Sequence, residues 1–243
     1  MKSADVEKAL RANVNAEKAA FYPRFFRTGP GEYGEGDRFL GVIIPHQRKI
    51  ARQFKELPGK ETLKLLRSKW HECRMTALLI LVIQYEKAKT DERRKEIYQL
   101  FMSNLDFVNN WDLVDSSCHK IAGPWLFERS RKPLYKLAST DHLWRNRIAV
   151  VTTYYFIKRG DFADTLSFAE QLLEHPHDLI HKAVGWMLRE VGKQDEKILC
   201  AFLEHHAASM PRTMLRYSLE KLDATKRERY MSAGPKRVAR KHK

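Results

Sequence analysis

The chain has 243 residues, of which 43% are hydrophobic, so it is long enough for one large or two small domains with a buried core. No apolar run reaches the roughly 18 to 20 residues of a membrane span, and the N-terminus lacks the apolar part of a secretory signal, so we expect a protein of the cytoplasm. The 45 Lys and Arg exceed the 30 Asp and Glu and give a net charge of +15, which favours nucleic acid as a partner over an anionic membrane; a basic surface that only solvates the protein is the alternative.

The cysteines and histidines do not indicate a disulfide framework or a zinc finger. Cys73, Cys118 and Cys200 are odd in number and far apart, and the sequence has no Cys-x-x-Cys pair. Histidines cluster only at residues 175–177 and 205–206, where a metal site would need carboxylate or thiolate partners from elsewhere in the fold. We therefore expect no metal and no cofactor.

The first 45 residues predict a helix, a loop and an extended segment. Apolar residues recur at helical spacing from Ser3 to about Ala20, and an aromatic and basic stretch follows at residues 21–27. Residues 28–37 are the one Gly-rich segment and read as a loop. No strand precedes it, no Gly-Lys-Ser/Thr follows it, and it contains acidic residues, so we do not expect it to cradle a phosphate. Residues 39–45 form an apolar extended run whose Pro45 suits the first turn of the next helix.

From Pro45 onward the pattern is helix after helix, in pairs. No stretch shows sustained period-2 alternation, so a sheet is not expected. The second helix of each pair opens with a polar or basic residue followed by small and apolar ones, and these openings are 38, 35, 35 and 30 residues apart. They begin at Arg74, Asp112, Arg147, Lys182 and Arg212. Two helices in about 30 to 45 residues are typical of a HEAT-like α-solenoid, whose inner helices line one concave surface.

We therefore predict an all-α fold in which residues 1–222 form a single HEAT-like-repeat domain. The remaining residues, 223–243, are rich in Lys and Arg and contain Gly234-Pro235. We expect this tail to be disordered and to attract DNA without specificity.

Three of the inner helices carry an unusual set of side chains. Trp111 and Asp115 are four residues apart, so on a helix they lie on one face. Arg147 and Trp186 follow on the next two inner helices, and a solenoid would bring all four together. Two indoles and a carboxylate suit a cationic ligand. As an alternative, Asp115 and Arg147 could be a structural ion pair between repeats, and a tryptophan at helical spacing is more often a core residue, which is what we expect of Trp70, Trp125 and Trp144.

Four segments of the chain resemble the AlkD-type DNA alkylation-repair family of HEAT-like-repeat DNA glycosylases. They are Phe39-Leu-Gly-Val-Ile-Ile-Pro-His-Gln-Arg48, Asn110-Trp-Asp-Leu-Val-Asp115, Leu143-Trp-Arg-Asn-Arg-Ile-Ala149 and Ile180-His-Lys-Ala-Val-Gly-Trp-Met-Leu-Arg-Glu190. The resemblance implies a right-handed, C-shaped α-solenoid with a basic concave groove for duplex DNA. It also implies hydrolysis of the N-glycosidic bond of alkylated purines, chiefly 7-methylguanine and 3-methyladenine, as a step of base excision repair.

The family's site residues match this sequence at most positions. By resemblance, Asp115 is the catalytic carboxylate, Trp111 and Trp186 are its paired tryptophans, and Arg147 is the arginine of the groove. The family's N-terminal tyrosine falls at Phe25, which lacks the hydroxyl group, and the Gly29–Asp37 loop is longer than in the family. Basic residues of the matching segments are the further expected DNA contacts: Arg48, Lys182 and Arg189.

The chemistry is consistent with these residues. An N3- or N7-alkylated purine is cationic and already a good leaving group, so the protein needs mainly to stabilise an oxocarbenium-like sugar and position a water. No lysine occupies the matching site, so a lyase step is not expected. Our first hypothesis is a monofunctional DNA glycosylase that acts on duplex DNA as a monomer and without a cofactor. The second is a non-catalytic solenoid that binds bent or branched DNA, and the third is a protein-interaction scaffold.

Overall fold

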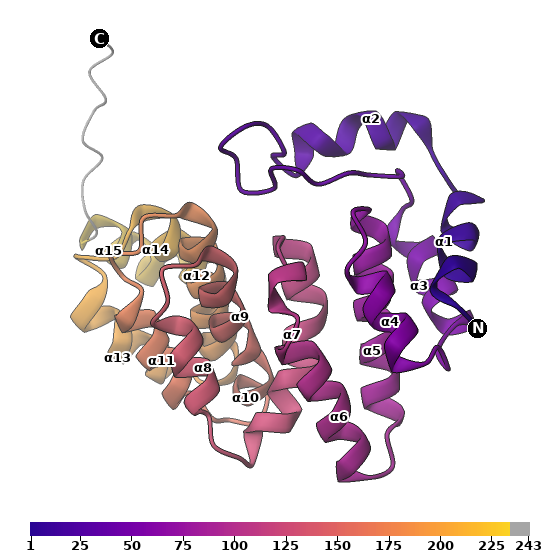
Figure 1. The fold of residues 1–243 in the computed structure, drawn as a ribbon. Helices are drawn as coiled ribbons and strands as arrows, with labels where there is room; N and C mark the ends of the chain where they lie inside the picture. Colours follow the sequence, from indigo (N-terminus) through magenta and orange to yellow (C-terminus); the bar gives the residue numbers. More distant parts are fainter. Residues whose placement is uncertain (234–243) are drawn as a thin grey trace. The chain divides into compact units, whose positions relative to one another are not determined.

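The structure is a computed structural model that describes residues 1–233, and within this range it is all helical (Figure 1). One isolated bridge between Arg38 and Trp70 is the nearest approach to a sheet in this part of the chain. The predicted all-α fold built from helix pairs is confirmed. No helix within residues 1–233 is both long and apolar enough to cross a membrane.

The chain divides into two compact units, Met1–Arg129 and Ser130–Lys243, and we describe each by itself. That residues 1–222 act as one domain, and that they form a C-shaped solenoid with a basic groove, stay predictions.

The first unit is built from α-helices and one short 3₁₀ helix, η1. In chain order they are α1 (Ser3–Arg11), α2 (Ala16–Phe25), α3 (Ile44–Gln53), α4 (Gly59–Leu66), α5 (His71–Lys87), α6 (Asp91–Met102), η1 (Leu105–Phe107) and α7 (Trp111–Phe127).

Helix α5 is the centre of this unit. It packs against α3, α4, α6 and α7, so it is surrounded by other helices (Figure 1). This explains its uniformly apolar stretch from Ala77 to Val82, in which every residue is buried, because a helix with no solvent face needs no polar stripe. The helix pairs α4–α5 and α6–α7 and the contact between α5 and α7 reproduce the repeat predicted for this part of the chain.

The N-terminus differs from the single helix that we predicted. Helix α1 ends at Arg11, and Asn15 caps a separate helix by accepting a hydrogen bond from the Lys18 N–H at 2.9 Å. Helix α2 then runs through the aromatic and basic stretch to Phe25 although it contains Pro23. The local apolar spacing continues across both helices, so it did not reveal the break between them.

Glu72 holds the extended segment in front of α3 in place. Its buried carboxylate accepts hydrogen bonds from the backbone N–H groups of Leu40, Gly41 and Val42, at 2.7 to 3.2 Å. Gly41 has a positive φ of 81°, and a Cβ atom there would lie 2.1 Å from the Asn15 carbonyl oxygen. The extended segment therefore passes directly under the N-terminus of α2, where only glycine fits.

The second unit repeats the pairing of helices. In chain order it contains α8 (Lys132–Ala138), α9 (Leu143–Thr152), α10 (Tyr154–Ile157), α11 (Ala163–Gln171), α12 (Asp178–Gln194), α13 (Glu196–His206), α14 (Arg212–Ser218) and α15 (Ala224–Ala233). Helix α12 packs against α9, α11, α13 and α14, so it is the central helix of this unit.

The predicted disordered tail begins as a helix. Residues 224–233 form α15, whose Tyr230 is buried and donates a hydrogen bond to Glu204 at 2.6 Å. Arg229 also bonds to Glu204, and Lys226 to Glu196. The expectation of disorder was wrong for this part, because side chains of α13 supply the partners that the local sequence lacks. Residues 234–243 lie outside the described residues.

Of the three tryptophans expected in the core, only Trp144 is buried, with 6% of its surface exposed. Trp70 and Trp125 are half-buried, and each has an arginine over its ring, Arg11 at 5.1 Å and Arg129 at 3.9 Å respectively. These two indoles are therefore covered by cationic side chains at the surface.

Gly41→Ala should destabilise the protein more than Gly160→Ala does. Both glycines have a positive φ, so each alanine costs about 1–2 kcal/mol of backbone strain. A Cβ at residue 160 meets nothing within 4 Å, whereas at residue 41 it collides with backbone atoms of Asn15 and Ala19, which adds about 1–3 kcal/mol. Urea denaturation followed by circular dichroism measures both changes, and equal losses would contradict the close approach.

Candidate functional site

The first unit contains a pocket of about 330 Å³ between helices α2, α3, α5 and α7. Its walls combine aromatic rings with carboxylates. The aromatic residues are Tyr22, Phe25, Phe26 and Trp111, and the acidic ones are Glu72, Asp112 and Asp115. Arg48, Gln47 and His71 also line it. Such a lining suits a flat or cationic ligand.

The aromatic wall is a packed stack with Phe26 at its centre. Phe26 stacks on Trp111 with ring centroids 5.5 Å apart and an interplanar angle of 23°, and on Phe39 at 5.1 Å. Phe25 meets Trp111 edge-on at 5.9 Å. One face of the Trp111 indole is therefore covered by Phe26, so its orientation is set by neighbouring rings before any ligand arrives.

The three acidic residues of the pocket have different partners. Glu72 is bound to the backbone of residues 40–42, as described above. Asp112 bonds to His71. Asp115 lies one turn after Trp111 on α7, is half-buried and lines the pocket with it. A carboxylate and an indole thus stand on the same side of one helix, as their spacing predicts.

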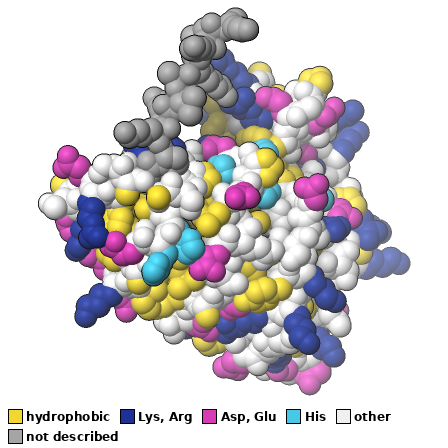
Figure 2. Space-filling model, turned by 90° about the vertical axis from the view of Figure 1, so that its left-hand side faces the viewer, with side chains coloured by type: hydrophobic (Ala, Val, Ile, Leu, Met, Phe, Trp, Pro, Cys, Tyr) yellow, Lys and Arg dark blue, Asp and Glu magenta, His cyan; other side chains and the backbone are white. Residues whose placement is uncertain are grey.

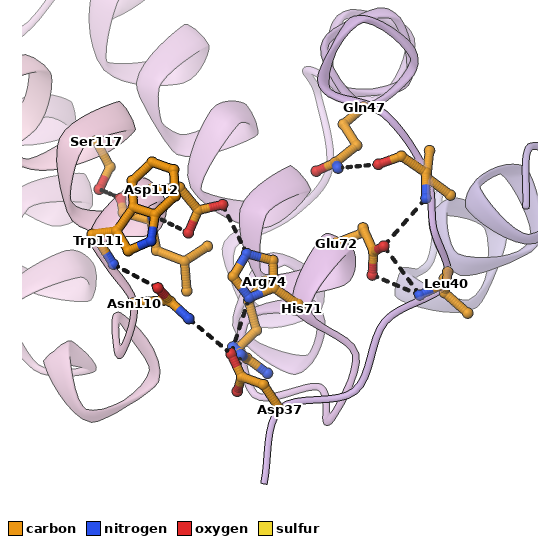
Figure 3. Close-up of polar contacts among 12 residues, drawn as sticks. Asp37, Leu40, Gln47, His71, Glu72, Arg74, Asn110, Trp111, Asp112 and Ser117 are labelled. Atoms are coloured by element: carbon orange, nitrogen blue, oxygen red, sulfur yellow. Dashed lines mark hydrogen bonds and ion pairs between the residues drawn. The ribbon is translucent and has the colours of Figure 1, made fainter. Parts of the chain in front are cut away.

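A buried histidine in the wall of this pocket connects three segments of the chain (Figure 3). The Nε2 atom of His71 lies 2.8 Å from Asp112 Oδ2, and its Nδ1 atom lies 3.1 Å from Asp37 Oδ2. Asp37 also accepts a hydrogen bond from Arg74 Nη2 at 2.5 Å and one from Asn110 Nδ2 at 3.4 Å. Asp37 is the last residue of the Gly-rich loop, so this network joins that loop to α5 and to the start of α7.

The two carboxylates keep His71 protonated. Burial alone would lower the pKa of His71, but the charge of Asp112 and the hydrogen bonds to Asp112 and Asp37 outweigh it and raise the pKa from 6.5 to about 9. Burial acts to raise the pKa of Asp37, yet the hydrogen bond from His71 and the charge of Arg74 bring it below its ordinary value. The group is therefore a buried set of two carboxylates, one imidazolium and one guanidinium.

Tyr22 stays a phenol in this setting. Burial, followed by the charges of Glu72 and Asp112, raises the pKa of Tyr22 above its ordinary value. The pocket therefore keeps a hydroxyl donor on α2. By resemblance, the family's tyrosine falls at Phe25, which has no hydroxyl group, but Tyr22 supplies one about a turn earlier on the same helix.

The sequence-predicted residues fall into two groups, one in each unit. Trp111, Asp115, Phe25 and Arg48 all line the pocket of the first unit. Phe25 is 48% exposed and Arg48 is exposed on α3.

The second unit carries Arg147, Lys182, Trp186 and Arg189. Arg147 is 5% exposed and donates a hydrogen bond to the Leu179 carbonyl group. Trp186 is half-buried and packs against Tyr154 at 6.0 Å. That these side chains act together with Trp111 and Asp115 stays a prediction.

The two remaining basic residues already have acidic partners. Lys182 pairs with Asp178 at 2.7 Å, and Arg189 pairs with Glu220 and Glu190. Any phosphate contact by either side chain would compete with these ion pairs.

Comparison with known proteins identifies the family and the fold of the chain. The family model described as DNA alkylation repair enzyme matches residues 6–222. The chain belongs to the DNA alkylation repair enzyme family. A search of curated proteins finds no match. A solved structure described as a predicted DNA alkylation repair enzyme from Enterococcus faecalis has 15% sequence identity and a TM-score of 0.66, over 87% of this chain and 98% of that one, so the fold is shared.

The sequence did not single out five residues of this site, which are Tyr22, Phe26, Asp37, His71 and Asp112. The sequence signal for Asp112 was its place directly after Trp111, and Asp37 stands at the end of the only Gly-rich loop. His71 had no local signal, because neither of its partners is near it in the sequence.

The Lys and Arg side chains of this alkylation-repair family member are unevenly distributed over the face shown in Figure 2. On the face shown in Figure 2, the coloured Lys and Arg side chains lie mostly towards the margins, with acidic, histidine and apolar side chains between them. That face therefore offers a mixed surface to a polyanion.

His71→Gln should remove a stabilisation that depends on pH. Because the folded pKa of His71 is raised, the stabilisation is fully present below pH 6.5 and is lost as the pH rises through about 9. The shift corresponds to about 3 kcal/mol in the free energy of unfolding. Urea denaturation from pH 6 to pH 10 should show wild type losing roughly this amount relative to His71→Gln.

The matched control is His119→Gln on α7. Burial lowers the pKa of His119 to about 4, so this ring is neutral over the same range. The variant should keep the alkaline loss of the wild type. An alkaline loss that is unchanged in His71→Gln would show that His71 is not the titrating group.

Proposed function

We propose that this protein is a monofunctional DNA glycosylase that hydrolyses the N-glycosidic bond of cationic alkylated purines, such as 7-methylguanine and 3-methyladenine, in duplex DNA. The observation that carries the proposal is the pocket in which Trp111 and Asp115 stand together on one face of α7. Family membership and the net charge of +15 support DNA as the substrate.

The reaction needs little help at the leaving group. Alkylation at N3 or N7 makes the purine cationic, so the glycosidic bond breaks as the base leaves neutral and positive charge develops on the sugar. A carboxylate close to the sugar stabilises that charge and can orient the water that attacks C1′. Asp115 takes this role in our proposal.

The aromatic residues would hold the electron-poor nucleotide. Trp111 is kept in one orientation by Phe25 and Phe26, so a ligand meets a prearranged indole. A cationic or electron-poor group against an aromatic face gains about 0.5 to 2 kcal/mol.

The proposal does not include a lyase step. Such a step needs an amine to form a Schiff base with the sugar. Among the described residues that line the pocket there is no lysine.

Asp115→Asn should slow the release of 7-methylguanine from methylated duplex DNA by about 100-fold or more, because it removes the charge that faces the developing cation. Single-turnover assays with chromatography of the released base measure the rate. Glu128→Gln is the control, since Glu128 is an exposed carboxylate at the C-terminal end of the same helix. Equal release by Asp115→Asn and wild type would exclude Asp115 as the catalyst, and no release by the wild type would overturn the enzyme proposal.

Arg48→Ala should weaken binding to duplex DNA of any sequence and reduce the slope of log affinity against log salt by about one. Arg48 is exposed at the pocket, whereas the control residue Arg11 pairs with Glu7 at 2.6 Å on α1. Fluorescence anisotropy at several salt concentrations measures both variants. Tight binding of undamaged branched DNA without base release would favour a non-catalytic DNA-binding protein, and weak, salt-insensitive binding would favour a scaffold.

A further inference from the structure

One ring joins the parts of the chain that build the pocket of the first unit. His71 is the first residue of α5 and is 2% exposed. On one side it reaches Asp37 at the end of the Gly-rich loop, and on the other it reaches Asp112 in the first turn of α7 (Figure 3).

We propose that His71 is a positioning residue of the candidate site: by bridging Asp37 and Asp112, its ring fixes the first turn of α7 and thereby the orientation of Trp111 and Asp115. The proposal rests on the proposed function for the meaning of the site, but the positioning can be tested without base release.

The bridge requires both ring nitrogens to donate. A neutral imidazole has one N–H, so it can donate to Asp37 or to Asp112 but not to both. After loss of the proton, one buried carboxylate would face a nitrogen lone pair, and the two acidic groups would repel each other without a cation between them. The geometry of the α7 start therefore depends on the charge of this ring.

Asp112 transmits the constraint through the backbone. Its Oδ2 atom lies against His71, while its Oδ1 atom accepts a hydrogen bond from the Leu113 N–H at 2.8 Å. Asn110, the residue before Trp111, accepts from the Trp111 N–H at 2.9 Å and donates to Asp37. Both neighbours of Trp111 are thus tied to the same network.

A second route runs through the aromatic rings. The His71 ring packs against Phe26 at 4.9 Å and against Phe39 at 5.0 Å, and Phe26 in turn covers Trp111. A charged imidazolium is attracted by these ring faces, and its neutral form is attracted less. A change in the charge of His71 therefore also affects Trp111 through Phe26, which contacts both rings.

The other titratable groups around the ring are held in different ways. Arg74, on α5 itself, bonds to Asp37, and Glu72 bonds to the backbone of residues 40–42. Tyr22 from α2, Arg48 from α3 and Asp115 from α7 line the same pocket. Burial and the charges of Glu72 and Asp112 raise the pKa of Tyr22 above its ordinary value, which moves its titration away from that of His71.

The test follows Trp111 directly in the full-length protein labelled with 5-fluorotryptophan. Trp111→Phe identifies its ¹⁹F resonance among those of the five tryptophans. Between pH 6 and pH 10 we expect the chemical shift of this resonance to change. The midpoint of the change should equal that of the titration of the His71 ring, followed by its own protons, near pH 9. His71→Gln should abolish the shift, and His119→Gln should preserve it.

The same variants are then compared for base release. We expect His71→Gln to release 7-methylguanine about tenfold or more slowly at pH 7, with its affinity for undamaged duplex within twofold of the wild type. The wild-type rate should fall through the midpoint at which Trp111 shifts, and this limb should be missing from the pH profile of His71→Gln.

A Trp111 resonance that stays in place while His71 titrates would overturn the proposal, whatever the activity. A wild-type rate and pH profile in His71→Gln would also overturn it. If Trp111 shifts but the wild type releases no base, the positioning stands and the proposed function fails. If His71→Gln does not fold, Asp37→Asn replaces it and should lower the midpoint of both titrations, because an amide oxygen at residue 37 accepts from Nδ1–H without a negative charge and stabilises the imidazolium less; an unchanged midpoint would count against the bridge.

Discussion

The arrangement of the first unit depends on one buried set of charges, in which His71 lies between Asp37 and Asp112 and Arg74 completes the set. Burying any one of these groups alone would cost several kcal/mol, so the set is stable only when all of its members are in place. It joins a loop, the start of the central helix α5 and the start of α7. The pocket therefore has walls that cannot shift independently of one another.

The aromatic stack is built on this charged base. Phe26 and Phe39 pack against His71, and Phe26 covers one face of Trp111. Prearranged dipoles and rings need no reorganisation when charge develops on a substrate, and this is the main contribution that a protein can make when the leaving group is already activated. The pocket of this DNA alkylation repair family member combines a carboxylate and a fixed indole on α7 with a phenol on α2, which suits the reaction that we propose.

The loop between α2 and α3 takes part in the same arrangement. Its acidic residues serve the loop itself, since Glu32 accepts from the Gly29 N–H and Glu35 from the Gly31 N–H, each at 2.9 Å. Its last residue, Asp37, bonds to His71, Arg74 and Asn110. The Gly-rich loop thus supplies Asp37, one half of the bridge through His71.

Much of the fold could be predicted from local patterns. The spacing of apolar residues located the helices of both units, and Pro45 marked the start of α3 within its first turn. The same periodicity placed Trp111 and Asp115 on one face of α7, because residues four apart are neighbours on any helix. Local patterns failed at two places: α2 continued through Pro23, and α15 formed against side chains of α13 instead of remaining a tail.

The sequence by itself determined the helical class, the repeat of helix pairs, the basic character and the pairing of Trp111 with Asp115, since each of these follows from composition or from short-range spacing. Only the tertiary structure decided that His71 bridges partners 34 and 41 residues away, that Phe26 covers the indole, and that Lys182 and Arg189 carry acidic partners. The physical reason is that burial and charge pairing are properties of groups brought together from distant parts of the chain. No periodicity along the sequence records them.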